Sequence, residues 1–234
     1  MLNIALVLPD VLGTYGDDGN ALVLRQRALM RGLSAEIHPI KLGEPVPDSM
    51  DIYTVGGGED AAQILAAEHL RADGGLQRAA AVGRPILAIC AGLQVLGTSF
   101  HAAGREVEGL GLLDATTSQL STRAIGEVVT TALLDDLTQP LTGFENHQGA
   151  TLLGPDARPL GRVQRGTGNT DAADAEGAVQ GSVVATYMHG PVLARNPELA
   201  DYLLAAAMGV EASTLEPLDL PAIDRLRAER LARI

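Results

Sequence analysis

Short apolar runs alternate with amphipathic stretches along the first hundred residues of the chain. The apolar runs are rich in branched side chains and predict strands at residues 3–8, 35–40, 51–55 and 85–89. The amphipathic stretches predict helices at residues 20–31, 59–70, 75–82 and 91–97. This alternation is typical of an open, mostly parallel α/β sheet with helices on both faces.

The pattern changes between about residues 109 and 187. Short branched runs are separated there by turns rich in Gly, Pro and Asn, which predict antiparallel or mixed strands added to the same sheet. Helices are predicted again at residues 197–208 and 221–234. Because no stretch has the composition of a linker, we expect one domain over residues 1–210, followed by a C-terminal helical extension over residues 211–234.

Charge and cysteine content narrow the classes of function. With 17 Lys and Arg against 29 Asp and Glu, the net charge of −12 argues against nucleic acid or an anionic membrane surface as the main partner. A single cysteine excludes an internal disulfide and a Cys-rich zinc site, so we expect no metal and a reducing, cytoplasmic location. The apolar run at residues 2–8 is too short for a signal peptide, and no stretch approaches the ~20 apolar residues of a membrane span.

The single cysteine stands at the end of the fourth predicted strand, in the string Ile89-Cys90-Ala91-Gly92-Leu93-Gln94. A lone cysteine is more often a small buried core residue than a nucleophile. A strand, a reactive residue, small residues and then a helix nevertheless form the pattern of a nucleophile elbow. The start of a helix favours a thiolate, and the Ala91 N–H points to where an oxyanion would form.

Three consecutive glycines, residues 56–58, end a second strand at the same sheet edge. They match neither a dinucleotide fingerprint nor a phosphate-binding loop. Glycine allows the backbone to approach a substrate closely, so Gly57 and Gly58 are candidates for a second oxyanion N–H.

A thiolate nucleophile also needs a proton-carrying base, and the chain has five histidines. His189 ends the predicted strand at residues 182–188 and precedes Gly190-Pro191, where a residue of the site should lie. His147 lies in a polar segment at residues 143–149, and its alternative role is to cap its own loop. Its position at the end of a strand therefore favours His189 over His147 as the base.

Taken together, the triple glycine, the string PILAICAGLQ at residues 85–94 and YMHGP at residues 187–191 resemble the class I (triad) glutamine amidotransferases. More narrowly, the sequence is similar to their cobyric acid synthase-like branch. Within it, the chain resembles the glutamine amidotransferase subunits (GatD) of lipid II isoglutaminyl synthases, because YGDDGN (15–20), GFENHQG (143–149) and GTGN (166–169) all look like segments of those subunits. The resemblance covers roughly residues 3–205 and implies a flavodoxin-like three-layer fold.

The resemblance implies a reaction on L-glutamine and assigns roles to seven residues. Cys90 would attack the side-chain amide to form a thioester, and His189 would protonate the departing ammonia and later activate water. The amides of Gly57, Gly58 and Ala91 would hold the oxyanion. Gln94 matches a residue that contacts the substrate glutamine, and Arg123 matches one that binds its carboxylate, for which a guanidinium fork is suited.

The sequence departs from the family pattern at Pro191, where the usual glutamate two residues after the histidine is missing. A histidine base is normally oriented by a carboxylate, so Asp17, Glu145 or a partner must supply it. The resemblance points to a Mur-ligase-like partner, MurT, in a heterodimer. That partner would hold ATP and metal, activate D-glutamate of lipid II and receive the ammonia, giving D-isoglutamine in peptidoglycan. We expect no cofactor in this chain and little glutaminase activity without the partner.

Two other functions stay open. A corrinoid amidotransferase of the cobyric acid synthase kind predicts an attached ATP-binding synthetase domain, for which we find no sequence signal. A catalytically silent module that binds and regulates a partner is favoured by the missing glutamate.

Overall fold

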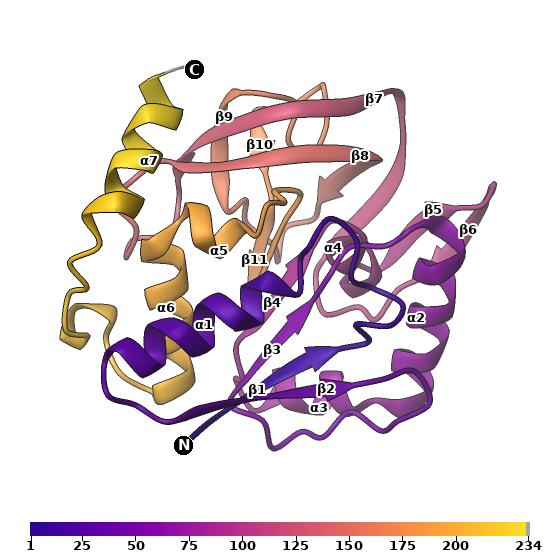
Figure 1. Cartoon of the computed structure of the whole chain (residues 1–234). Helices are drawn as coiled ribbons and strands as arrows, with labels where there is room; N and C mark the ends of the chain where they lie inside the picture. The colour runs from indigo at the N-terminus through magenta and orange to yellow at the C-terminus, as the bar shows by residue number, and fades with distance from the viewer. Residues whose placement is uncertain (233–234) are drawn as a thin grey trace.

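A six-stranded sheet forms the centre of the molecule, as the computed structural model of residues 1–232 shows (Figure 1). Its strands lie in the order β11-β12-β4-β3-β1-β2, and all neighbours are parallel except β11 and β12. The prediction of a mostly parallel sheet is therefore confirmed. The strands are β1 (Leu2–Val7), β2 (Ala35–Ile40), β3 (Ile52–Val55), β4 (Ile86–Ile89), β11 (Ala178–Gln180) and β12 (Val183–Thr186).

Helices flank this sheet on both sides (Figure 1). On one side α1 packs against α5 and α6, and on the other α2 contacts α3 and α4. Every residue of β3, β4 and β12 is buried between these layers, which explains their continuous apolar runs. The helices are α1 (Gly19–Met30), α2 (Asp60–Asp73), α3 (Gly75–Ala81), α4 (Ala91–Leu96), α5 (Val192–Arg195) and α6 (Pro197–Met208).

Most strands of the second half form a sheet of their own, so the expectation that they extend the first sheet is wrong. Only β11 and β12 join the central sheet. The second sheet has the order β10-β9-β7-β5-β6, with β8 paired to β7. Its strands are β5 (Ser99–Ala102), β6 (Arg105–Glu108), β7 (Ala115–Ala132), β8 (Leu141–Leu153), β9 (Gly161–Arg165) and β10 (Ala175–Glu176).

The antiparallel pair β7–β8 passes beyond the carboxyl ends of the central strands (Figure 1). Buried and exposed residues alternate along much of both strands, as expected for a sheet with one solvated face. Branched runs and turns predict such strands well, but they do not say which sheet a strand will join. The polar segment around His147 was expected to be a loop, but it is part of β8.

After α6 the chain forms a 3-10 turn (Ala212–Thr214) and then α7 (Pro221–Ala232). The guanidinium of Arg227 donates to the backbone oxygens of Pro140 and Arg195, which holds α7 against the end of α5 and the residue before β8. The helix was expected to continue to Ile234, but residues 233–234 lie outside the described part. The division at residue 210 remains a prediction. Within residues 1–232, no helix is both long and apolar enough to cross a membrane.

Candidate active site

Cys90 lies at the turn between β4 and α4 in a strained backbone conformation, with φ of 52° and ψ of −105°. A non-glycine residue in this region is uncommon and is found at sharp functional turns. Gly92 permits the turn, because a Cβ there would lie 3.0 Å from the carbonyl oxygens of both Val55 and Gly56. The side chain of Cys90 borders a cavity of about 220 Å³, and the residue is 8% exposed.

His189 borders the same cavity and is held by a carboxylate of this chain. Its Nδ1 lies 3.0 Å from both Oδ1 and Oδ2 of Asp17, which comes from the loop between β1 and α1. Both residues are 2% exposed. Among residues 1–232 nothing makes a hydrogen bond to the other ring nitrogen, Nε2, which leaves it as the atom that can exchange a proton in the cavity.

The environment of His189 favours its protonated form. Burial lowers the pKa of His189, but the interactions with Asp17 and with Cys90 raise it to about 10. An imidazolium at neutral pH can deliver a proton to a departing amine. Cys90, His189 and Asp17 therefore have the arrangement of nucleophile, acid–base group and orienting carboxylate.

The carboxylate that orients His189 is Asp17, one of the alternatives that the sequence left open. The other candidate, Glu145, instead accepts hydrogen bonds from the backbone N–H groups of Thr167 (2.7 Å) and Gly168 (2.9 Å), so it anchors the loop between β9 and β10. The position beside His189 Nδ1 that was expected for a partner's carboxylate is thus filled from this chain.

Of the two glycines that were expected to offer an N–H to the oxyanion, Gly57 has a different role in the structure. The Gly57 N–H donates to Asp17 Oδ2 at 2.9 Å, so it does not point to an oxyanion. A Cβ at Gly57 would lie 3.1 Å from both Asp17 Oδ2 and His189 Cε1, so glycine is what allows these groups to converge. Gly58 and Ala91 border the cavity, and they remain the candidates for the oxyanion donors.

Gln94 borders the cavity from α4, where it is buried rather than on the helix surface. Its Oε1 accepts a hydrogen bond from Gln63 at 2.5 Å, and its Nε2 donates to the Tyr187 hydroxyl at 3.0 Å. The amide is therefore fixed in one orientation, and contact with a substrate remains a prediction. Neither Gln63 nor Tyr187 was singled out as a site residue. Nothing local marks Gln63, whereas Tyr187 begins the string YMHGP that carried part of the family resemblance.

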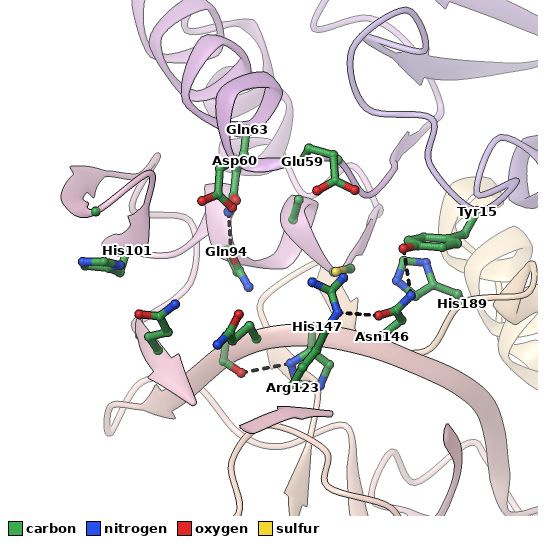
Figure 2. Close-up of a pocket in the computed structure, with 17 residues that line it drawn as sticks. Tyr15, Glu59, Asp60, Gln63, Gln94, His101, Arg123, Asn146, His147 and His189 are labelled. Carbon is green, nitrogen blue, oxygen red and sulfur yellow. Dashed lines mark hydrogen bonds between the residues drawn. The ribbon is translucent and has the colours of Figure 1, made fainter. Parts of the chain in front are cut away.

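Arg123 lies across the cavity on β7 and is exposed. Its Nε donates to Asn146 Oδ1 at 2.7 Å, and Asn146 Nδ2 donates to the Tyr15 hydroxyl at 2.8 Å (Figure 2). The ring of Tyr15 lies 4.9 Å from that of His189. Asn146 and Tyr15 were not singled out as site residues, although both lie in the strings that carried the family resemblance.

Comparison with known proteins agrees with this geometry. Residues 3–197 match the model of the CobB/CobQ-like glutamine amidotransferase domain. The chain belongs to this family. It is 36% identical over 233 residues to the GatD subunit of the glutamine-hydrolysing lipid II isoglutaminyl synthase of Staphylococcus aureus, which covers 98% of this chain and 94% of that protein.

Two further comparisons place this glutamine amidotransferase within its family and fold. It is 36% identical over 181 residues to the cobyric acid synthase of Sphingopyxis alaskensis, but that match covers 73% of this chain and only 34% of the synthase. A crystal structure of a glutamine amidotransferase has the same fold, with a TM-score of 0.58 and 18% identity over 87% of this chain and 98% of that one.

Proposed function

We propose that this chain is the glutaminase subunit of a two-subunit enzyme that amidates lipid II. The observation that carries the proposal is the similarity to a GatD subunit over 94% of that subunit's length. A cavity bordered by Cys90 and His189, with Asp17 hydrogen-bonded to the imidazole, supports it. The cobyric acid synthase match covers only a third of that enzyme, so the corrinoid reaction has weaker support.

In the proposed reaction, Cys90 Sγ attacks the side-chain carbonyl carbon of L-glutamine. The negative charge that develops on the carbonyl oxygen is held by the N–H groups of Gly58 and Ala91. His189 Nε2 gives its proton to the amide nitrogen, the C–N bond breaks, and ammonia leaves a thioester on Cys90. His189 then takes a proton from water, whose oxygen attacks the thioester and releases glutamate and the thiolate.

Asp17 and Arg123 have supporting roles in this scheme. Asp17 accepts the Nδ1–H of His189, which directs Nε2 into the cavity and stabilises the imidazolium. Arg123 binds the α-carboxylate of glutamine, and Gln94 contacts the substrate from the opposite wall. The net change is hydrolysis of glutamine to glutamate and ammonia.

The ammonia goes to a Mur-ligase-like partner of the MurT kind, which forms a heterodimer with this chain. That partner holds ATP and metal and activates the α-carboxylate of D-glutamate in lipid II, so this chain needs no cofactor of its own. The product is D-isoglutamine in the peptidoglycan precursor, and the reaction takes place in the cytoplasm.

The test is glutamate release from L-glutamine by the chain alone and with the co-expressed partner, followed by mass spectrometry of lipid II. We expect the complex to release glutamate and to add one amide to lipid II in an ATP-dependent manner. Cys90→Ala should abolish both products. Glutamate release that survives Cys90→Ala would contradict the mechanism. If neither the chain nor the complex releases glutamate, the chain is a silent module.

A further inference from the structure

Three hydrogen-bonded side chains connect the two walls of the cavity. Arg123 and Asn146 are on the neighbouring strands β7 and β8, and Tyr15 is on the loop between β1 and α1 (Figure 2). The Tyr15 ring is tilted by 59° to the His189 ring at a centroid distance of 4.9 Å. A continuous line of contacts therefore runs from the guanidinium of Arg123 to the imidazole of His189.

Asn146 is the centre of this line, because its amide uses both of its ends. Its oxygen accepts from Arg123 Nε, and its nitrogen donates to the Tyr15 hydroxyl. A carboxylate could only accept and an ammonium could only donate, so the pair of bonds needs a side chain that does both, as the amide of Asn146 does. Asn146 bonds to Nε of Arg123, so both terminal NH₂ groups of Arg123 have no partner in residues 1–232. These two groups can bind a carboxylate with two parallel hydrogen bonds.

The position of the Tyr15 ring depends on the Asn146 amide more than the position of a buried ring would. Tyr15 is 48% exposed, and its backbone has a φ of 60°, which is uncommon for a residue other than glycine. Few packing contacts hold an exposed ring, so the hydrogen bond to Asn146 is a large part of what keeps it against His189.

We infer that Asn146 is a positioning residue that acts at both ends of the bound glutamine. It orients Arg123 for the α-carboxylate, and through Tyr15 it holds an aromatic ring against the imidazole of His189. Substrate recognition and the placement of the acid–base group are thereby linked by one amide. The inference rests on the proposed hydrolysis of glutamine.

Steady-state kinetics separate the two effects of Asn146. In Asn146→Ala we expect KM for glutamine to rise about tenfold and kcat to fall severalfold, because Arg123 and Tyr15 both lose an anchor. In Tyr15→Phe the bond between Asn146 and Arg123 is kept, so kcat should fall while KM stays within about twofold. The matched control is Gln164→Ala. Gln164 is another exposed amide that joins two strands of the same sheet, by a hydrogen bond to Thr131, but it lies outside the cavity. In this control, KM and kcat should both stay unchanged.

Labelling of Cys90, read by mass spectrometry, gives a second measurement that a merely structural role would not reproduce. The glutamine analogue 6-diazo-5-oxo-L-norleucine carries the α-carboxylate, whereas iodoacetamide does not. Asn146→Ala should slow labelling by the first about tenfold and leave labelling by the second unchanged. Thermal unfolding of each variant checks that it is folded.

The outcomes distinguish this inference from the proposed function. If the wild-type protein with its partner releases no glutamate, and the analogue does not label Cys90, the proposed function and this inference are both wrong. If the wild type is active but Asn146→Ala keeps its KM, or slows both labelling reagents equally, the inference alone is wrong. If Tyr15→Phe raises KM as much as Asn146→Ala does, the hydroxyl serves Arg123 and not His189, which also overturns it.

Discussion

The two walls of the cavity are built in different ways. One wall is the carboxyl edge of the central sheet, where Cys90, His189 and Asp17 are 8%, 2% and 2% exposed. The other wall is the antiparallel pair β7–β8, where Arg123 is exposed and is held by a side-chain hydrogen bond to Asn146. The buried wall places the groups that would react, and the open wall places Arg123, which would bind the carboxylate of the substrate.

The difference follows from how each wall is fixed. On the buried wall a strained backbone at Cys90 and a glycine N–H bonded to Asp17 leave almost no freedom. On the open wall, one side-chain hydrogen bond within residues 1–232 holds the guanidinium of Arg123, so it can adjust to a ligand. We therefore expect changes on the buried wall to lower kcat and changes on the open wall to raise KM.

The largest effect is expected from Asp17→Asn. The amide keeps the size of the side chain but loses the charge that orients and stabilises the imidazolium, so kcat should fall by on the order of 10²–10⁴. The measurement is the initial rate of glutamate release at saturating glutamine, with and without the partner. A complex that keeps its full rate would show that another carboxylate, such as the partner's, orients His189 during the reaction.

The same variant should change the titration of His189. The pKa of about 10 is raised above the ordinary value near 6.5, so the stabilisation from the imidazolium is fully present below about pH 6.5 and is lost as the pH rises through 10. Asp17→Asn removes a cause of the raised pKa. We expect ring-nitrogen NMR of His189 to show a protonated imidazole at pH 8 in the wild type and a titration at lower pH in the variant. Identical titration curves would mean that Asp17 does not control this proton.

On the open wall, Arg123→Lys tests recognition separately. Lysine keeps the charge but lacks the planar fork, so KM for glutamine should rise about tenfold while kcat changes less than about threefold. The measurement is a full substrate curve for the complex, with Gln164→Ala as the control. If kcat falls as far as it does in Asp17→Asn, the division between the two walls does not hold.

The sequence predicted the buried wall better than the open one, for a physical reason. Cys90 and His189 end buried parallel strands, and the topology brings such strand ends to one edge, so a local pattern was sufficient to place them together. Asp17 could be named but not chosen over Glu145, because loop conformation decides which carboxylate reaches the imidazole. The same holds for Gly57, whose N–H was expected to serve the oxyanion but is taken by Asp17.

The open wall depends on pairing between strands that are distant in the sequence. Arg123 was found through the family resemblance alone, and its contact with Asn146 arises only from the register of β7 against β8, where Ala124 pairs with His147. Polar residues in a long antiparallel strand give no local signal of which ones will face a cavity, and the sequence did not show that these strands form a second sheet.

The smallest effect on activity and stability is expected from an ion pair at the surface, which joins β7 to α5 and α7. Glu127 of β7 accepts from Arg195 of α5 and, at 2.6 Å, from Arg230 of α7. Arg230 is about half exposed, so Arg230→Ala should lower the free energy of unfolding by less than about 0.5 kcal/mol and leave kcat and KM unchanged. Urea unfolding and the glutamine assay measure the two quantities. Because α5 follows His189 closely and β7 carries Arg123, a shift in both kcat and KM would show that this ion pair, and α7 with it, holds the two walls in register.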